Sequence, residues 1–278
     1  MKSIQPQLLA LALTFASGVS AMAQGKLVIK GSDTLGAKMV PQLAEAYRAD
    51  GNNATFEIAA EGSSTAFSNL LAGTADIGMS SRAVKDSEVA KFTAKGQKIN
   101  EIVAAWDMIA VIVNSKNSLK GLTTDQIEGI FTGDITDWSE VGGKPGPISA
   151  YTRNTSSGTY KTFQSLGMAK RDYGSRTQKM AGNEQIATEV GKNINGIGYV
   201  GLAYTKAAGI KAVEVNKVAC TPKKVKKYPL ARKLFYYTVG EPTGEAKKFL
   251  DWSTKKKAAK KVVERVGFVP LKTGLFSR

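Results

Sequence analysis

Three short segments of the sequence are rich in Ser, Thr and Gly, and each follows a predicted strand and precedes a predicted helix. They lie at residues 32–34, 62–65 and 157–159. The first turn of a helix leaves backbone N–H groups without intrahelical partners, and the helix dipole makes that end positive. Hydroxyl side chains add donors there, and glycine lets the backbone approach a ligand. The spacing therefore predicts a site for an anion.

Two arginines strengthen this prediction, because Arg82 and Arg153 stand at the ends of neighbouring predicted strands. The planar guanidinium fork matches the oxygens of phosphate or carboxylate. A single Ser/Thr loop is more often an ordinary helix cap, but three such loops with two arginines indicate a binding site. The GxxxxGK[ST] pattern is absent, since Gly143 and Lys144 are followed by Pro145. We therefore expect a small oxyanion rather than a nucleotide.

Alternating strands and helices must position these loops. Short strands are predicted at 26–30, 55–59 and 75–79, with helices between them. This alternation favours a mostly parallel sheet flanked by helices, whose carboxyl strand ends carry the binding loops. Two longer apolar segments, 101–114 and 234–239, are predicted to cross between lobes.

The composition excludes several classes of site. The 278 residues include 39 Lys and Arg, 23 Asp and Glu, one Cys and no His. Without His there is no Ser-His-Asp or Cys-His catalytic set, and the lone Cys220 forms no internal disulfide. We expect no catalytic residues, no metal site and no cofactor. Residues 205–278 carry a net charge of +14, which predicts either solvated lysine faces or a docking surface for an acidic partner or anionic lipid.

The N-terminal segment is predicted to be a signal peptide covering residues 1–23. Lys2 precedes an apolar run at 8–19, and Ala21-Met22-Ala23 is a small-x-small cleavage site. The apolar run is too short to span a membrane. No Cys lies near the cleavage site, so we expect a soluble periplasmic protein without a lipid anchor.

Four motifs together resemble those of a known family. They are GSDTL at 31–35, EGSST at 61–65, ADIGMSSR at 75–82 and RNTSSGT at 153–159. Their order and spacing look like the periplasmic phosphate-binding proteins of phosphate ABC transporters. NGIGYV at 195–200 and LFYYTV at 234–239 also fit, so the resemblance covers essentially the whole mature chain.

The resemblance implies a set of phosphate-binding residues on both sides of a cleft. Carried over position by position, they are Ser32, Thr34, Leu35, Ser63, Ser64, Ser81, Arg82, Arg153, Ser157, Gly158 and Thr159. Ser81 stands where some relatives have Asp, whose carboxylate would accept a proton from phosphate and repel a fully deprotonated anion such as sulfate. A Ser hydroxyl both donates and accepts, so the choice of anion stays open at this point. Asp33 or Glu61 is a candidate replacement acceptor.

The resemblance also implies an α/β fold, a two-lobed periplasmic-binding-protein clamshell. Each lobe would be a mixed, mostly parallel sheet flanked by helices, with hinge strands near 106–113 and 228–237 joining the lobes. Residues 24–107 plus 234–278 would form lobe I, and residues 108–233 would form lobe II.

The expected function is capture of inorganic phosphate by lobe closure, followed by delivery to a membrane ABC permease. The protein would act as a monomer and bind no nucleic acid. The alternatives are a binding protein for another tetrahedral oxyanion such as sulfate, a phosphohydrolase, and a basic polyanion-binding protein.

Overall fold

The computed structural model describes residues 25–271, and the predicted signal peptide lies outside them. Strands and helices alternate through the first part of the chain, as the sequence predicts. The strands are β1 (Gly25–Gly31), β2 (Ala54–Ala59), β3 (Ile77–Ser80), β4 (Ile99–Asn114), β5 (Gly121–Leu122), β6 (Ser149–Arg153), β7 (Gln178–Met180), β8 (Gly196–Gly201), β9 (Ile210–Ala212), β10 (Glu214–Val215) and β11 (Ala231–Val239). The α-helices are α1 (Asp33–Gly36), α2 (Met39–Ala49), α3 (Ser63–Leu71), α4 (Asp86–Thr93), α5 (Thr124–Thr132), α6 (Gly158–Gly167), α7 (Asn183–Lys192), α8 (Gly244–Lys255) and α9 (Lys257–Val266). Short 3-10 turns are η1 (Trp138–Val141), η2 (Leu202–Tyr204) and η3 (Pro222–Lys224).

One mixed sheet runs through the described part of the molecule. Its strand order is β2-β1-β3-β11-β4-β8-β6-β7, with β9 also paired to β4. β1 pairs in parallel with β2 and β3, and β6 pairs in parallel with β7 and β8. The pairings of β11 with β3 and of β4 with β11, β8 and β9 are antiparallel. A small separate sheet pairs β5 with β10.

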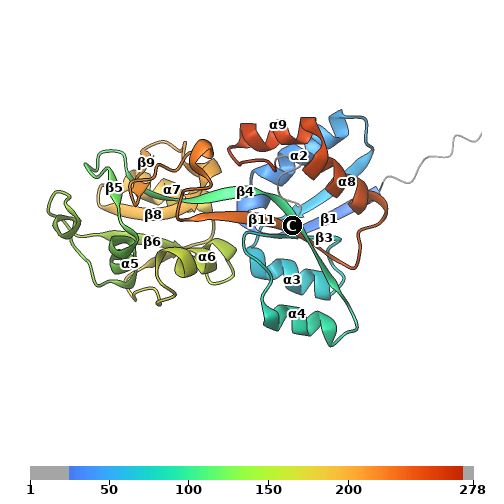
Figure 1. Ribbon diagram of the computed structural model, residues 1–278, viewed down its shortest axis with the longest axis horizontal. Coiled ribbons are helices and arrows are strands. Elements are labelled where there is room, and N and C mark those ends of the chain that lie inside the picture. The colour runs from blue at the N-terminus through green and yellow to red at the C-terminus, as the bar shows by residue number, and fades with distance from the viewer. Residues whose placement is uncertain (1–24, 272–278) are drawn as a thin grey trace, which may run out of the picture.

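The long strands β4 and β11 connect two lobes (Figure 1). β4 pairs with β11 as far as Met108 and with β8 from Ile109 onward, so its two parts belong to two different groups of strands. We refer to β1–β3, α1–α4, α8 and α9 as lobe I and to β5–β10, α5–α7 and η2 as lobe II. The predicted two-lobed clamshell is confirmed, while its exact lobe boundaries remain a prediction.

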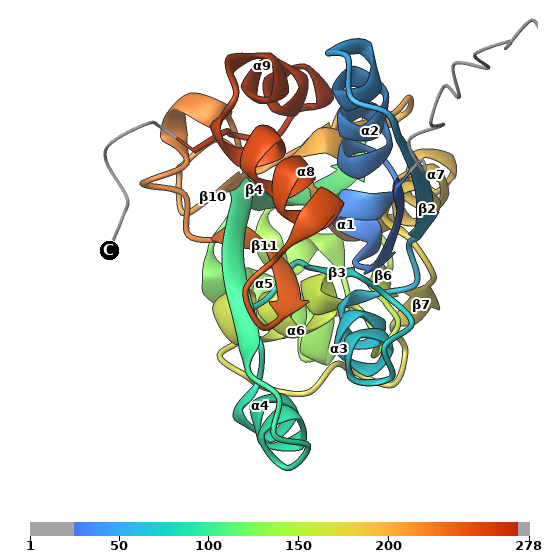
Figure 2. The ribbon, with the colours of Figure 1, turned by 90° about the vertical axis from the view of Figure 1, so that its right-hand side faces the viewer.

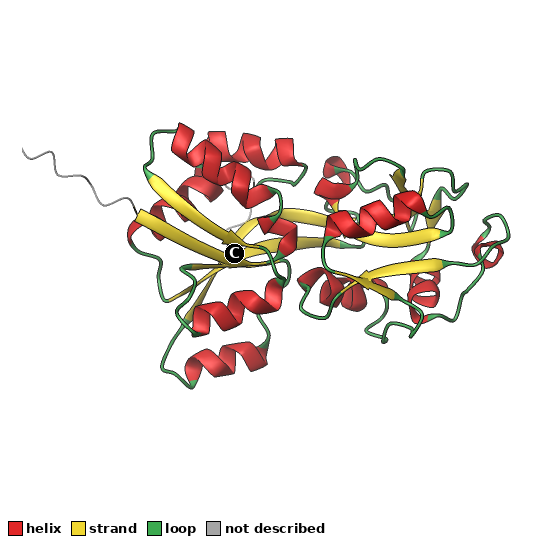
Figure 3. Cartoon of the chain, turned by 180° about the vertical axis from the view of Figure 1, so that it is seen from behind, coloured by secondary structure: helices red, strands yellow, loops and turns green. Residues whose placement is uncertain are grey.

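Helices cover both faces of the strands in each lobe (Figure 3). Seen end on, α2, α8 and α9 lie on one side of the lobe I strands and α3 and α4 lie on the other (Figure 2). Two large apolar clusters are buried. One contains Ile29 and Phe249 of lobe I and continues to Ile186 of α7 in lobe II. The other, with Phe131 and Tyr199, lies mainly in lobe II. The apolar core is therefore continuous between the lobes on the α7 side.

Local sequence explains where the helices begin. Pro41 lies in the first turn of α2, where its missing N–H costs nothing because that position has no intrahelical acceptor. Thr123 and Gln126 form a capping box at α5. Helices α4 and α7 had not been predicted from the sequence. No helix within residues 25–271 is long and apolar enough to cross a membrane.

Candidate functional site

Three helix starts meet where the two lobes touch. α1 and α3 begin in lobe I, and α6 begins in lobe II after Ser157, whose Oγ accepts the backbone N–H of Tyr160 at 3.2 Å. Gly62 precedes α3 with φ of +124°, and a Cβ there would lie 2.6 Å from Ser156 Oγ of lobe II. Glycine is required at this position by both its backbone angle and the closeness of the opposite lobe.

Four hydroxyl side chains from these segments form a buried cluster, which we call the hydroxyl cluster: Thr34, Ser63, Ser81 and Thr159. Each is at most 1% exposed. Thr34 Oγ1 of lobe I lies 3.0 Å from Thr159 Oγ1 of lobe II, and Ser63 Oγ lies 3.2 Å from Ser81 Oγ. Ser81 Oγ lies 3.5 Å from Thr159 Oγ1 and so links the two pairs. The structure therefore brings these four predicted site residues together, while their binding of phosphate stays a prediction.

Gly158 closes the cluster from the lobe II side. A Cβ at this position would lie 2.3 Å from Ser63 Oγ and 2.6 Å from Ser81 Oγ. The α6 backbone therefore approaches lobe I more closely than any side chain would allow, and its first N–H groups lie beside the hydroxyls.

Arg153 supplies a buried positive charge beside the cluster. Its side chain is 1% exposed, and its Nε and Nη2 donate to the Ala181 carbonyl at 3.1 and 2.7 Å. Its Nη1 donates to Asp33 Oδ2 across the lobe boundary at 3.1 Å. Burial lowers the pKa of the guanidinium from its ordinary value, and the Asp33 carboxylate opposes that change. Arg153 remains a cation, since an Arg pKa starts far above neutral pH.

Tyr199 supports Arg153 from behind. Its hydroxyl accepts the backbone N–H of Arg153 at 3.3 Å and lies 2.6 Å from Thr152 Oγ1. Burial raises the pKa of Tyr199 to about 12, so the phenol is neutral at physiological pH.

A second buried arginine at the site was missed by the sequence reasoning. Arg232 on β11 donates from Nε and Nη2 to Asp107 Oδ2 on β4, at 3.0 and 2.7 Å. Its Nη1 donates to the Ser81 carbonyl at 3.1 Å, and its Nη2 lies 3.5 Å from Thr34 Oγ1. Asp107 Oδ1 also accepts the N–H of Leu202 from lobe II at 3.0 Å. The Asp107–Arg232 ion pair is buried between the crossing strands β4 and β11, next to the hydroxyl cluster.

The sequence did contain a signal for this pair. Asp107 interrupts the apolar run of β4, and Arg232 opens the apolar strand β11. Both strands are predicted to cross between the lobes. Because an unpaired buried charge is costly, the carboxylate in one strand and the guanidinium in the other are expected to pair.

The remaining predicted residues lie around the cluster with other partners. Arg82 donates to both carboxylate oxygens of Glu88, at 2.8 and 2.6 Å, and its Nη2 lies 3.4 Å from Ser64 Oγ. The Ser64 N–H donates to the Ser156 carbonyl across the lobes at 3.1 Å. Ser32 and Leu35 are buried at α1, with Leu35 in the lobe I core. The two arginines therefore reach neighbours of the hydroxyl cluster: Arg153 donates to Asp33, next to Thr34, and Arg82 reaches Ser64, next to Ser63.

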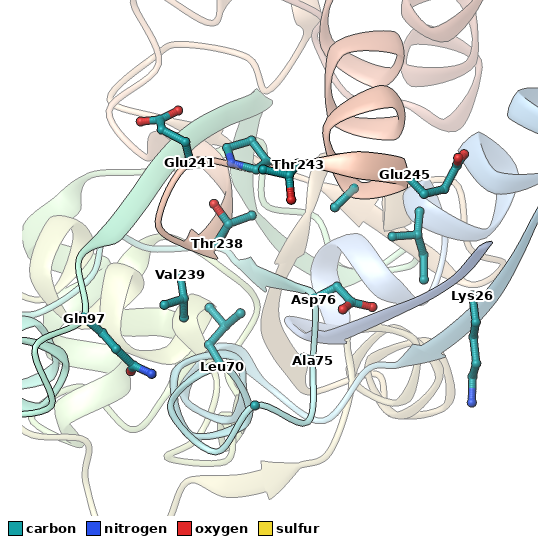
Figure 4. Close-up of a pocket in the computed structure, with 14 residues that line it drawn as sticks. Lys26, Leu70, Ala75, Asp76, Gln97, Thr238, Val239, Glu241, Thr243 and Glu245 are labelled. Atoms are coloured by element: carbon teal, nitrogen blue, oxygen red, sulfur yellow. The ribbon is translucent and has the colours of Figure 1, made fainter.

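Other features lie apart from this site. Within residues 25–271 no group of three or more acidic, His or Cys side chains is placed to hold a metal ion. A surface pocket of about 440 Å³ on lobe I is lined by Lys26, Asp76, Gln97, Glu241 and Glu245 among others (Figure 4), and it contains none of the predicted site residues. Two lysine-rich segments of the basic C-terminal part, 223–227 and 255–261, lie at η3 and where α8 meets α9, and most of their lysines are exposed.

Comparison with known proteins relates this geometry to function. The sequence profile of the PBP superfamily domain matches residues 17–257. The chain is 33% identical to the phosphate-binding protein PstS of Pseudomonas aeruginosa over 92% of this chain and 85% of that protein. It is 29% identical to PstS of Bacillus subtilis over 90% of this chain and 82% of that protein.

Solved structures show the same fold. The chain superimposes with a TM-score of 0.81 and 31% identity on a Clostridium perfringens protein described as a phosphate ABC transporter substrate-binding protein with bound phosphate, covering 89% of this chain and all of that one. An ABC-type phosphate transport receptor from Vibrio cholerae matches with a TM-score of 0.71 and 28% identity, over 88% of this chain and 100% of that one.

Proposed function

The chain belongs to the PBP superfamily, and on that premise we propose that it captures inorganic phosphate between its lobes and delivers it to an ABC permease. The observation that carries the proposal is the hydroxyl cluster, built from both lobes at converging helix starts beside Arg153. Helix N-termini, hydroxyls and a guanidinium fork are the donors that a tetrahedral oxyanion accepts from.

The proposed ligand set follows from this placement. Thr34, Ser63 and Ser81 would hold phosphate from lobe I, with backbone N–H groups of α1 and α3. Thr159, the N–H groups at the start of α6 and the free edge of Arg153 would close on it from lobe II. Leu35 would add its backbone N–H. The N–H groups of Ser32, Ser64 and Ser157 already donate to backbone carbonyls, so these three residues would contribute their hydroxyl groups. Arg82 would act at the edge of the site, through Ser64.

The energetics permit tight binding without a metal. Hydrogen bonds to a charged group contribute about 1.5–3 kcal/mol each. Micromolar binding requires about 8 kcal/mol. About eight such bonds would supply roughly 12–24 kcal/mol, which permits micromolar affinity after desolvation of the anion and lobe closure offset part of the gain.

Closure gives the permease a means of telling loaded protein from empty protein. Bringing two lobes together around the anion changes their relative position, and a partner that contacts both lobes would read that change. We propose that the protein performs this role as a periplasmic monomer without a lipid anchor and that it has no enzymatic activity, in keeping with relatives named as phosphate-binding and phosphate transport proteins.

Calorimetric titration of phosphate-stripped protein at pH 7 and pH 5 tests the proposal. We expect saturable one-to-one phosphate binding, weakened by less than tenfold in the presence of excess sulfate. Absence of heat and of ligand retention with either anion would refute the proposal.

Capture of another tetrahedral oxyanion such as sulfate is the second candidate, and one observation favours it. Ser81 presents a hydroxyl where some relatives have a carboxylate, and the neighbours of its Oγ are the hydroxyls of Ser63 and Thr159. A hydroxyl accepts a proton less strongly than a carboxylate does and repels sulfate less. Equal affinity for the two anions in the same titration would favour this candidate.

A further inference from the structure

Asp33 joins the two lobes at the edge of the hydroxyl cluster. It is the first residue of α1 in lobe I, and its Oδ2 accepts from Arg153 Nη1, Asn183 Nδ2 and the Asn183 backbone N–H at 3.1, 2.6 and 3.1 Å. All these donors belong to lobe II. The carboxylate therefore accepts three hydrogen bonds across the lobe boundary and caps α7, a ten-residue helix of the opposite lobe.

The lobe II side of this contact is rigidly oriented. Asn183 is fully buried, and its Oδ1 accepts the backbone N–H of Gly201 at 3.0 Å, which leaves Nδ2 directed at Asp33. Gly182 precedes α7, and a Cβ there would lie 3.0 Å from Asp33 Oδ1. The start of α7 is thus shaped to receive a carboxylate from lobe I.

The Asp33 carboxylate also orients Arg153 while leaving some N–H donors of its guanidinium group available. The Ala181 carbonyl accepts from the Nε and Nη2 edge, and Asp33 accepts from Nη1. A guanidinium has five N–H donors, so one on each terminal nitrogen remains for an anion. Asp33 and the anion can therefore hold Arg153 at the same time.

A further contact from lobe II meets the same turn. The Tyr204 hydroxyl lies 3.2 Å from the Asp33 carbonyl and 3.3 Å from the Thr34 carbonyl, and donates to this pair of oxygens. Closing the lobes thus forms polar contacts to both the backbone and the side chain of Asp33.

We propose that Asp33 is a positioning residue for anion capture: it fixes Arg153 and latches lobe II onto lobe I through the start of α7. The proposal rests on the proposed function for its ligand. It predicts that Asp33 controls how long phosphate stays bound rather than how fast it arrives, because the latch forms on closure and its negative charge does not attract the anion.

The first test is Asp33→Asn, measured as the release of radiolabelled inorganic phosphate chased with unlabelled phosphate. The amide keeps the size of the side chain, and its oxygen can still accept from Arg153 and Asn183, but the negative charge that pairs with Arg153 is lost. We expect dissociation to accelerate roughly tenfold to a hundredfold, with an association rate equal to or above that of the wild type. The matched control is Asp76→Asn in lobe I, whose carboxylate accepts the Val28 N–H within the same lobe, and its rates should equal those of the wild type.

A second variant tests the latch from the other lobe. Asn183→Asp still accepts from Gly201 but places a carboxylate against Asp33, so dissociation should again accelerate. In the double variant Asp33→Asn/Asn183→Asp an amide again faces a carboxylate, and release should be slower than in Asn183→Asp alone. The double variant also keeps the inference testable should one single variant fail to fold.

The outcomes separate this inference from the proposed function. Wild-type protein that retains no phosphate refutes the proposed function. Wild-type protein that binds phosphate while Asp33→Asn releases it at the wild-type rate refutes the latch alone. The latch would also be overturned if Asp33→Asn slowed phosphate association as much as it accelerated dissociation. It would likewise be overturned if the dissociation rate of the double variant rose by the product of the two single-variant factors.

Discussion

Gly158→Ala is the perturbation whose effect the structure defines most closely. The added methyl carbon would lie 2.3 Å from Ser63 Oγ, and Cβ contacts under 3.0 Å essentially do not occur. Rotating the Ser63 side chain away does not relieve the clash cheaply, because Ser63 Oγ accepts the Ser81 N–H at 2.9 Å and Ser63 Cβ itself would be 2.9 Å away. The lobes must therefore part by at least about 0.7 Å.

This separation removes contacts to the anion. The interlobe distances beside Gly158 are already at hydrogen-bond length, with Thr34 Oγ1 3.0 Å from Thr159 Oγ1. An anion held from both lobes would lose about two charge-assisted hydrogen bonds, each worth about 1.5–3 kcal/mol. The expected loss of about 3–6 kcal/mol corresponds to phosphate affinity weakened about 10²- to 10⁴-fold.

Calorimetric titration of stripped protein with phosphate measures this loss, and thermal unfolding verifies that the variant folds. Gly167→Ala, at the other end of the same helix, is the matched control. Its Cβ would meet Leu230 Cδ2 at 3.4 Å, an ordinary contact, so its affinity should stay within about twofold of wild type. A Gly158→Ala protein that binds phosphate within about threefold of wild type would refute the close approach of α6 to lobe I during capture.

Further experiments test the charged residues and the partly buried thiol of Cys220. Arg153→Lys replaces a planar fork by a single ammonium and should weaken phosphate binding about 10- to 100-fold by calorimetry, whereas exposed Arg171→Lys should not change it. Asp107→Ala leaves the buried Arg232 without its partner carboxylate. The substitution should lower the free energy of unfolding in urea by about 3–5 kcal/mol. The exposed Asp251→Ala should lower it by less than about 1 kcal/mol, and equal losses would contradict the buried pairing. Burial raises the pKa of the Cys220 thiol to about 12 from 9.0, so folded protein should resist thiol labelling at pH 8 and react once unfolded in urea. Because the folded-state pKa is the higher one, this thiol's contribution to stability is present below about pH 9 and is lost as pH rises toward 12.

The architecture was predictable because local signals agreed with one another. Apolar runs bounded by Gly and Ser marked β1, β2 and β3, and the hydroxyl-rich segments after them marked the helix starts. The long apolar segment at 101–114 indicated the crossing strand β4, which in fact begins at Ile99. Helix α7 was not predicted, although its role at the site follows from Asn183 at its start.

The site was predictable where a residue lies in a loop motif and unpredictable where its role depends on tertiary pairing. Thr34, Ser63 and Thr159 follow from their motifs. Arg232 is indicated only by its charge within an apolar strand, and Asn183 has no such signal. Both reach the site because β11 crosses between the lobes and α7 packs next to α1.

Hydrogen exchange measured by mass spectrometry, with and without phosphate, tests most directly whether the anion is captured between the lobes. The proposed site predicts that phosphate slows exchange in segments 33–37 and 63–67 of lobe I and in segment 158–162 of lobe II together. Slowing confined to one lobe, or centred on the lysine-rich segment 255–261, would contradict capture at the hydroxyl cluster.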